Sequence, residues 1–444
     1  MIRQPLRKVL AASAAVAALT ICASALAFTP PSFPRLGGVE YGNPFNYNDP
    51  TVQAQLAKQS IVLLNDYPGM TVGGESMSTV VSQIKAINPN TLVFIYVQSD
   101  YETPNPSSGD AWTAYDDQLN SMKWWLYPDT SFSSPVPEPN NTGWYVINNT
   151  PNTPKDSSGD DSIDWETKFF VSNFYTPNTN IDGFFMDNVY TQPGVAGDWY
   201  RDGTVLQPSD PRAQAAIQSG YERYFSLVRT LMPGKYQIGN VAEWAQSGSV
   251  PSGYTNMADG GLLEAIIGAS WSIEGWGGWQ QMMSQYNSVM ASMNSPQLVI
   301  FNQYGSPTDY QSFRYGFASC LMNNGYYSFT NPSNGYTGVV WFDEYNANLG
   351  QPTSSSLPTA AWQNGVWRRD FTNGIALVNP KGNGVQTVQL GGTFVKINGT
   401  QDPSVNNGQT VTSVTLQDRD GIILLRQSAE EQPKAPTGVS ATSG

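Results

Sequence analysis

Residues 211–242 read PRAQAAIQSGYERYFSLVRTLMPGKYQIGNVA, and this stretch holds one helix-then-strand repeat of the kind that decides the fold. Asp210 before Pro211 supplies an N-cap and a first-turn proline, which predicts a helix over 211–232. The pair PG ends that helix, and the apolar run after it predicts a strand over 237–242. Strands that alternate with helical segments in this way are typical of parallel α/β folds.

The same alternation runs from residue 36 to residue 330. Short β-branched and aromatic runs predict eight strands, over 36–41, 61–65, 92–98, 183–189, 237–242, 262–267, 298–303 and 326–330. Further helices are expected over 80–87, 276–293 and 310–323. Eight parallel strands with helices between them close into a barrel. We therefore predict the α/β class and a (β/α)₈ TIM barrel with insertions over 28–349.

Three regions depart from the barrel pattern. The largest insertion follows the third strand, at about 100–159, and is rich in Trp, Pro, Asn and Ser; loops of this length are usually functional. The runs GIALVNP, VQTVQLGG, TFVKING, VTSVTL and GIILLR predict a small antiparallel β-domain over 350–427. Residues 428–444 predict a polar tail, in which PTGVSAT resembles the opening of a fibronectin type III module.

Residues 1–27 are typical of a signal peptide. A basic start precedes an apolar run over 9–23, and Ala-Leu-Ala predicts cleavage after Ala27. We therefore expect a secreted or periplasmic protein with no membrane span. A lipoprotein site at Cys22 is an alternative, although the residue before it is not small. Cys320 would be the one cysteine left after cleavage, so no intramolecular disulfide is possible, and its apolar neighbours favour a buried, inert thiol.

The composition excludes several classes of protein. The chain has no histidine, so it cannot build a Ser-His-Asp triad, a Cys-His pair or a His-ligated metal site by itself. Its 22 Lys and Arg against 35 Asp and Glu give a formal charge of −13, which becomes 19 − 35 = −16 after cleavage. Such a charge disfavours nucleic acid as a partner. Protein partners cannot be inferred from the composition.

Four carboxylates lie at or near the ends of predicted strands, where a TIM barrel gathers its active site: Asp66, Asp187, Glu243 and Glu264. Glu264 stands inside an apolar run, which is costly unless it is paired, hydrogen-bonded or protonated. No basic residue near the strand ends offers a pair. A structural alternative for Asp187 is a cap on a backbone N–H. Two carboxylates in a histidine-free cleft predict glycosidic cleavage, which needs no metal or cofactor.

Several segments resemble known glycosidases. IDGFFMDNV (181–189) resembles the fourth-strand segment of glycoside hydrolase family 114 and of the hypothetical GHL15-like glycoside hydrolases. IGNVAEW is similar to their fifth-strand Asn segment, and WFDEYNANLGQP to the segment that leaves the eighth strand. RRDFTNGIALVNPKG and VTLQDRDGIILLR resemble the β-domain after the barrel, so the resemblance covers roughly 35–427.

The resemblance implies specific roles. Asp187 is the expected nucleophile and Glu264 the expected acid/base of a retaining mechanism, and Asn240 is expected in the cleft. The tryptophan-rich insertion is unlike the compact family 114 barrel, so that family's α-1,4-galactosaminan substrate does not transfer directly.

Further residues are candidates for binding substrate. Asp66 would hydrogen-bond sugar hydroxyls or tune Asp187, with a structural role as the alternative. Glu243 competes with Glu264 as the acid. The candidate stacking platforms for sugar faces, each with a core position as its alternative, are Trp244, Trp271, Trp276 and Tyr304.

Two acidic segments allow more than one interpretation. Asp343 and Glu344 either close the far end of the cleft or form a solvated pair at the domain junction. KDSSGDDSID (155–164) is expected to be a solvated loop, with a weak calcium site as the alternative.

The sequence as a whole predicts a secreted glycosidase that acts on a polysaccharide. The anionic chain favours a neutral or amino-bearing glycan over an acidic one. The rival hypothesis is a carbohydrate-binding or adhesion protein that keeps the barrel without turnover. A metal-dependent deacetylase is disfavoured because such sites usually use histidine.

Overall fold

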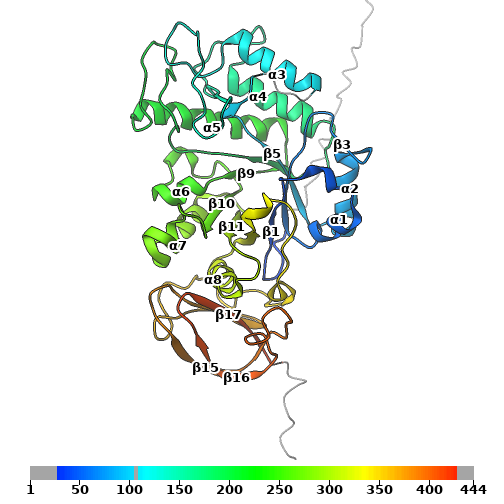
Figure 1. Ribbon diagram of the computed structural model, residues 1–444, viewed down its shortest axis with the longest axis vertical. Helices are drawn as coiled ribbons and strands as arrows, with labels where there is room; N and C mark the ends of the chain where they lie inside the picture. The colour runs from blue at the N-terminus through cyan, green and yellow to red at the C-terminus, as the bar shows by residue number, and fades with distance from the viewer. Residues whose placement is uncertain (1–27, 105–108, 428–444) are drawn as a thin grey trace, which may run out of the picture.

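The computed structural model describes residues 28–104 and 109–427. The expected signal peptide and the expected C-terminal tail lie outside these residues. Within them, eight parallel strands form one sheet in the order β1-β2-β5-β8-β9-β10-β11-β12 (Figure 1). A parallel bridge between Leu36 and Tyr327 joins the last strand to the first, so the sheet closes into a barrel. The predicted fold class is confirmed.

The barrel strands coincide with the apolar runs of the sequence. They are β1 (Gly37–Val39), β2 (Ile61–Leu64), β5 (Leu92–Val97), β8 (Gly183–Met186), β9 (Tyr236–Asn240), β10 (Gly260–Ile267), β11 (Leu298–Tyr304) and β12 (Tyr326–Thr330). Alternate side chains of these strands fill the interior, among them Phe94, Phe185, Ile238 and Leu262. The remaining apolar side chains face the surrounding helices and form the larger core.

The helices around the barrel are α1 (Pro50–Leu56), α2 (Met77–Ile87), α5 (Pro211–Leu231), α6 (Ala242–Ser247), α7 (Ile273–Ser292) and α8 (Tyr310–Cys320). Helix α5 begins as its sequence indicates, because the side chain of Asp210 accepts a hydrogen bond from the backbone N–H of Arg212 at 2.8 Å. Gly278 interrupts α7 with φ 78°. Turns of 3-10 helix occupy Pro44–Asn46, Ser252–Tyr254, Pro332–Asn334 and Asp343–Asn346.

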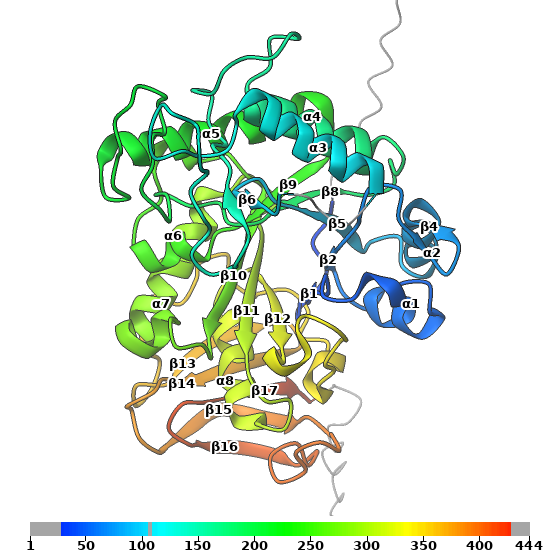
Figure 2. The same ribbon diagram turned by 45° about the horizontal axis from the view of Figure 1, so that its top comes forward.

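The expected insertion after β5 forms a layer over the barrel. It contains β6 (Tyr101–Glu102), α3 (Gly109–Met122), β7 (Tyr145–Val146) and α4 (Ser162–Phe170), which a π-helical turn over Val171–Tyr175 extends. A small hairpin of β3 (Thr71–Val72) and β4 (Glu75–Ser76) follows β2. Figure 2 shows α3, α4 and α5 together at one end of the molecule. Trp124 and Trp125 of the insertion are fully buried, so they pack its interior.

A second, antiparallel sheet lies at the opposite end (Figure 2). Its strand order is β13-β14-β17-β15-β16, and the strands are β13 (Trp367–Phe371), β14 (Gly374–Asn379), β15 (Gln386–Lys396), β16 (Thr410–Leu416) and β17 (Asp420–Arg426). The prediction of two strands over the residues of β15 is wrong. Gly391, with φ 72°, produces a register irregularity between Gln389 and Phe394 instead of a turn.

This sheet contacts the barrel through helix α8. Arg314 of α8 forms ion pairs with Asp402 and, at 3.2 Å, with Asp420, both in the C-terminal sheet domain. All three side chains are largely buried. Arg369 of β13 donates to the carbonyl oxygen of Leu321 at 3.0 Å, directly after α8. Helix α8 and the residues directly after it therefore connect the barrel to the C-terminal sheet.

Candidate active site

The pleat of the barrel strands brings polar side chains together at one end of the interior. Phe94, Phe185, Ile238 and Leu262 point into the barrel. Because side chains two residues apart lie on the same side of a strand, the next inward positions toward the carboxyl ends are Tyr96, Asp187, Asn240 and Glu264. The same period places Tyr41 beyond Val39 of β1. These residues form the candidate active site, at the end of the barrel where TIM-barrel enzymes act.

Asp187 follows β8 and is held by neutral donors. Its Oδ2 accepts a hydrogen bond from the hydroxyl of Tyr96 at 2.8 Å. Its Oδ1 accepts from Nδ2 of Asn240 and from the backbone N–H of Asn188, both at 2.9 Å. Asn188 has φ 53°, a left-handed conformation that Asn tolerates better than most residues.

Glu264 stands at a bulge in β10. The register of β10 against β11 shifts between Leu263 and Ile267, and Ala265 has φ 46°. A non-glycine residue with this φ is strained. Two contacts hold it there: its N–H donates to Oδ1 of Asn302 at 3.0 Å, and its carbonyl accepts from Oγ of Ser272 at 2.5 Å. The bulge therefore fixes the backbone directly after Glu264.

The Glu264 carboxylate is held on both oxygens. Oε2 accepts a hydrogen bond from Nδ2 of Asn240 at 2.8 Å. Oε1 accepts from the hydroxyl of Tyr304 at 2.6 Å and also from that of Tyr336. Nδ2 of Asn240 therefore bridges Asp187 and Glu264, which the sequence placed on different strands. Both carboxylates are only partly buried, so solvent or a ligand reaches them.

The surroundings of Asp187 raise its pKa on balance. Burial raises the pKa of Asp187 to about 6, and the nearby Glu264 carboxylate adds to the increase. Hydrogen bonds from Tyr96, Asn240 and the N–H of Asn188 act in the opposite direction and lower it. At neutral pH Asp187 is therefore mostly ionised, and it takes up a proton under mildly acidic conditions.

Tyrosines enclose the two carboxylates. Tyr41 packs against Tyr96 and Tyr336 with ring centroids 5.0 and 4.7 Å apart, and Tyr304 lies 6.1 Å from Tyr336. Of these tyrosines, only Tyr304 was predicted from the sequence, and Tyr41, Tyr96 and Tyr336 were not. The two-residue strand period signals Tyr41 and Tyr96. Tyr336 comes from the loop after β12, for which the sequence offers no such signal.

Trp244 and Glu243, both predicted to bind substrate, are held in structural contacts outside this cluster. Trp244 is wrong as a stacking platform: it is fully buried, its Nε1 donates to the carbonyl oxygen of Val189 at 2.6 Å, and its ring packs on Tyr254. Both oxygens of Glu243 are occupied by Thr191, from its N–H at 2.8 Å and its hydroxyl at 2.7 Å. The geometry therefore favours a structural role for Glu243, which fixes the loop after β8.

The remaining candidates divide between surface and interior. Trp271 is 50 % exposed and meets the ring of Tyr304 edge-on at 6.3 Å, so it is available as a platform beside Glu264. Trp276 is also exposed and donates to the carbonyl oxygen of Trp271 at 3.2 Å.

Asp66 is buried, which raises its pKa to about 7, and it forms no hydrogen bond with Asp187. No hydrogen bond therefore supports the expected role of Asp66 in tuning Asp187.

The acidic pair after β12 belongs to the domain junction. Oδ2 of Asp343 accepts the backbone N–H groups of Thr400 and Gln401 at 2.6 and 2.9 Å. Glu344 is buried, and its Oε1 accepts from Nδ2 of Asn406 at 2.7 Å. Both carboxylates therefore hold the barrel against the C-terminal domain, and the expected solvated pair is wrong for Glu344.

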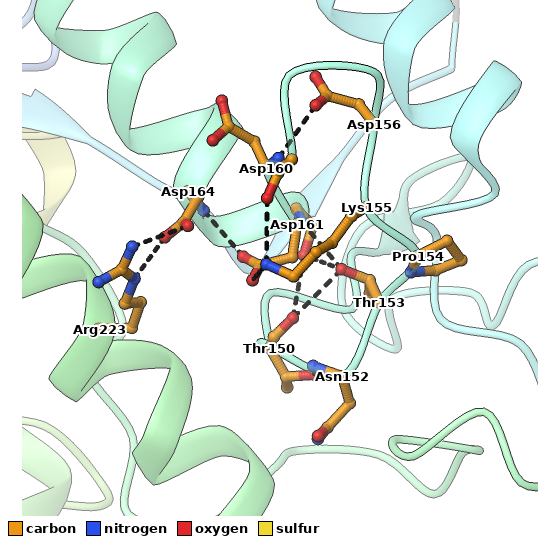
Figure 3. Close-up of polar contacts among 12 residues, drawn as sticks. Thr150, Asn152, Thr153, Pro154, Lys155, Asp156, Asp160, Asp161, Asp164 and Arg223 are labelled. Atoms are coloured by element: carbon orange, nitrogen blue, oxygen red, sulfur yellow. Dashed lines mark hydrogen bonds and ion pairs between the residues drawn. The ribbon is translucent and has the colours of Figure 1, made fainter.

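The acidic segment 155–164 uses its carboxylates within the protein (Figure 3). Asp160 pairs with Lys168 at 2.5 Å, Asp161 with Lys155 at 3.5 Å, and Asp164 with Arg223 at 2.5 Å. Across 28–104 and 109–427, no group of three or more Asp, Glu, Cys or His side chains could hold a metal ion. These ion pairs favour a structural loop that caps α4 over the calcium alternative. The expected solvated loop is wrong for Asp160, Asp161 and Asp164, which are buried.

Two carboxylates that share one hydrogen-bond donor at the strand ends of a TIM barrel are compatible with the site of a glycoside hydrolase. A family model described as hypothetical glycosyl hydrolase family 15 (GHL15) matches residues 85–375, more than half of the chain. The chain therefore belongs to this family, and its enzyme class is glycosidase. The expected GHL15 resemblance is confirmed, whereas family 114 is not specifically indicated. A search of curated proteins found no significant match.

Several solved glycosidases have similar structures. A variant of the glycoside hydrolase domain of PelA from Pseudomonas aeruginosa has 13% identity and a TM-score of 0.39, over 70% of this chain and 99% of that one. An α-amylase from Malbranchea cinnamomea has 11% identity and a TM-score of 0.44, over 86% and 89%. An acarbose complex of the Geobacillus thermoleovorans α-amylase has 10% identity and a TM-score of 0.44, over 89% and 98%. At these values the likenesses carry no argument about substrate or mechanism.

Proposed function

We propose that this protein is a secreted glycosidase that cleaves a polysaccharide by a retaining two-carboxylate mechanism, with Asp187 as nucleophile and Glu264 as acid/base. The observation that carries the proposal is the bridge from Nδ2 of Asn240 to both carboxylates. The division of roles follows the resemblance of the fourth-strand segment to the group that contains family 114 and the GHL15-like glycoside hydrolases.

The bridge limits the separation of the two carboxylates. Because its hydrogen bonds measure 2.9 and 2.8 Å, the oxygens that they reach lie at most about 5.7 Å apart. Retaining glycosidases place their carboxyl groups about 5 to 5.5 Å apart, whereas inverting enzymes need about 6.5 to 9.5 Å to admit a water. The separation therefore supports retention.

In the proposed first step, the Asp187 carboxylate attacks the anomeric carbon while Glu264 donates its proton to the departing glycosidic oxygen. This step breaks the glycosidic bond and forms a glycosyl ester on Asp187. In the second step Glu264 takes a proton from water, the water oxygen attacks the anomeric carbon, and the ester bond breaks. Asp187 is then a carboxylate again, and Glu264 is protonated for the next cycle.

Further features of the chain support the proposed substrate and location. The basic and apolar residues 1–27 support secretion. Among the described residues no helix is long and apolar enough to cross a membrane. Trp271, exposed beside Tyr304, supports a polymeric substrate that continues along the surface from Glu264. The overall negative charge supports a glycan without acidic groups.

The experiment is reducing-end release from soluble neutral α- and β-glycans, α-linked galactosaminan and polygalacturonate. Activity of the wild type on a neutral or amino-bearing glycan, absent from Glu264→Gln, is the expected result. Proton NMR of the first-formed product then reads its anomeric configuration, and retention is expected. Silence across the panel, with one glycan still bound, would favour the carbohydrate-binding alternative.

A further inference from the structure

Two exposed tryptophans lie in the segment 268–280, where the chain passes from β10 into helix α7. Trp271 is 50 % exposed and Trp276 is 57 % exposed, while all but one of the other tryptophans that the structure describes are buried or partly buried. The surface beside them is open, because a Cβ added at Gly275 or Gly278 would meet no atom within 4 Å apart from the backbone next to it. Exposed aromatic rings on an open surface are typical of binding sites.

Hydrogen bonds tie this segment to the bulge that carries Glu264. The hydroxyl of Ser272 donates to the carbonyl oxygen of Ala265 at 2.5 Å, directly after Glu264. Trp276 is joined to the same turn, because its Nε1 donates to the carbonyl oxygen of Trp271 at 3.2 Å. The backbone that carries the two indole rings is therefore fixed relative to the expected acid/base.

The surface of the segment presents no free charge. Glu274 is the one charged residue of 268–280, and it is buried. Its Oε1 accepts from Nε of Arg419 at 3.2 Å, so its charge is paired inside the protein. The exposed part of the segment consists of indole rings, glycine and uncharged polar side chains. The apolar C–H face of a sugar ring matches such a surface, since it can stack on an indole ring.

The two tryptophans lie on one defined side of the carboxylate pair. Four site residues follow one another around the barrel, on or directly after β8, β9, β10 and β11: Asp187, Asn240, Glu264 and Tyr304. The hydroxyl of Tyr304 donates to Glu264 at 2.6 Å, and its ring meets that of Trp271 edge-on at 6.3 Å. Trp271 therefore lies beyond Glu264 on the side away from Asp187.

The proposed chemistry gives this side a meaning. The nucleophile and the departing oxygen lie on opposite sides of the attacked anomeric carbon, and the acid contacts the departing oxygen. The saccharide that remains bonded to this oxygen is the reducing-end part of the substrate. It therefore extends from Glu264 away from Asp187, which is the direction in which Trp271 lies.

We propose that Trp271 and Trp276 stack on two consecutive sugar units on the reducing-end side of the cleaved bond. The preferred reducing-end product therefore contains at least two sugar units. This assignment rests on the proposed function, because it takes Asp187 as the nucleophile and Glu264 as the acid. It adds the direction in which the polysaccharide lies across the site and the residues that hold its departing part.

The test is the position of cleavage in maltohexaose, cellohexaose and the α-1,4-galactosaminan hexasaccharide. Hydrolysis in water enriched in heavy oxygen labels only the new reducing end, so mass spectrometry distinguishes the two products of each cut. The wild type is expected to release unlabelled products of two or more sugars from at least one hexasaccharide. Trp271→Ala and Trp276→Ala are each expected to lower kcat/KM about 3- to 10-fold, the loss of one stacking contact. Trp276→Ala should also raise the share of unlabelled monosaccharide.

Two further variants separate stacking from a structural role. Trp276→Phe keeps an aromatic face but loses the hydrogen bond to Trp271, and it is expected to retain the wild-type product pattern. Equal effects of Trp276→Phe and Trp276→Ala would mean that the side chain only holds the turn together, and would overturn the proposal. Trp362→Ala removes an exposed tryptophan outside the barrel, whose ring lies 4.7 Å from the guanidinium of Arg368. It is the matched control, with unchanged products and kcat/KM.

Failure of this assignment differs from failure of the proposed function. Hydrolysis with the same products and kcat/KM in the wild type and both alanine variants, or with monosaccharide as the main unlabelled product of the wild type, would retain the function and overturn the assignment. If no hexasaccharide is cleaved, affinity electrophoresis of the Glu264→Gln protein in soluble starch, hydroxyethyl cellulose and galactosaminan decides the rest. Binding that both alanine substitutions weaken would reject the function and the reducing-end assignment but leave a saccharide-binding surface, and absence of binding would reject all three. Thermal unfolding of each variant shows that a lost signal does not come from a lost fold.

Discussion

Asp187 and Glu264 accept hydrogen bonds from the same nitrogen, Nδ2 of Asn240, at 2.9 and 2.8 Å. Each carboxylate has further donors on its far side, Tyr96 for Asp187 and Tyr304 for Glu264. The two groups are therefore fixed relative to each other, as a reaction that needs both at one bond requires.

Asn240→Ala is expected to lower kcat about 10- to 150-fold. The variant removes one hydrogen bond from each carboxylate, and bonds to charged groups contribute about 1.5 to 3 kcal/mol. Steady-state kinetics on the best substrate measure the effect. A variant that folds and keeps wild-type kcat would show that the bridge does not position the pair.

The pH dependence of kcat/KM is expected to show an acidic limb near pH 6. The nucleophile must be ionised, and the pKa of Asp187 is raised to about 6, so activity falls as the pH drops through that value. Tyr96→Phe removes a bond that lowers this pKa and should move the limb to higher pH. An unchanged limb in Tyr96→Phe would assign it to another group.

The raised pKa of Asp187 also makes the free energy of unfolding depend on pH. The native pKa of Asp187 lies above the value of about 3.9 in the unfolded chain, so the native state binds more protons between the two values. This group's contribution therefore favours folding below about pH 4 and declines as the pH rises to about 6. Asp187→Asn should flatten this part of the stability profile, measured by denaturant unfolding.

Ala265 is expected to tolerate glycine but not valine. With φ 46° the alanine bears a left-handed strain of about 1 to 2 kcal/mol, which Ala265→Gly relieves. Ala265→Val places a β-branched side chain in that conformation and should cost about 2 kcal/mol or more and lower kcat through Glu264. Equal unfolding free energies and kcat for both variants would show that the bulge is not needed.

Trp244 and Trp271 were both predicted as stacking platforms, but their substitutions are expected to have different effects on KM and on unfolding free energy. Trp271→Ala should raise KM for the polysaccharide with little change in unfolding free energy, because this side chain is half exposed. Trp244→Ala removes a fully buried ring and should cost about 3 to 5 kcal/mol. Thermal unfolding and KM, measured on both, separate the roles; a stable Trp244→Ala with a raised KM would restore Trp244 as a platform.

Arg314→Met is expected to destabilise the protein by about 3 to 5 kcal/mol. The variant leaves the buried carboxylate of Asp420 and the partly buried carboxylate of Asp402 without their partner. Arg212→Met, at an exposed ion pair with Asp202, is the control and should change stability little. Similar unfolding midpoints for the two variants would show that the junction does not depend on this network.

The sequence carried enough information to predict the barrel and the carboxylate pair. Each barrel strand is an apolar run bounded by polar residues. Glu264 interrupts such a run at a position that faces the barrel interior. A carboxylate there is costly unless it is paired or hydrogen-bonded, which indicated a functional group. Asn240 was found through the family resemblance, although its position two residues after the inward Ile238 also indicates it.

The errors have identifiable physical reasons. Trp244 follows a strand closely enough to look like part of the cleft, but it lies on the short helix α6, whose rotation turns it into the core. Tyr336 reaches Glu264 from a loop 72 residues later in the chain, a contact that local patterns do not contain. The run at 386–396 looks like two strands because a glycine pair signals a turn as readily as a bulge.

The most direct measurement is the rate of reducing-end release, on the best substrate, by the wild type, Asp187→Asn, Glu264→Gln and Glu243→Gln, all shown to be folded. The account predicts that the first two variants each lose about 100-fold or more in rate, while Glu243→Gln keeps most of it. Full activity in Asp187→Asn or Glu264→Gln, or a loss confined to Glu243→Gln, would contradict the assignment of the catalytic pair.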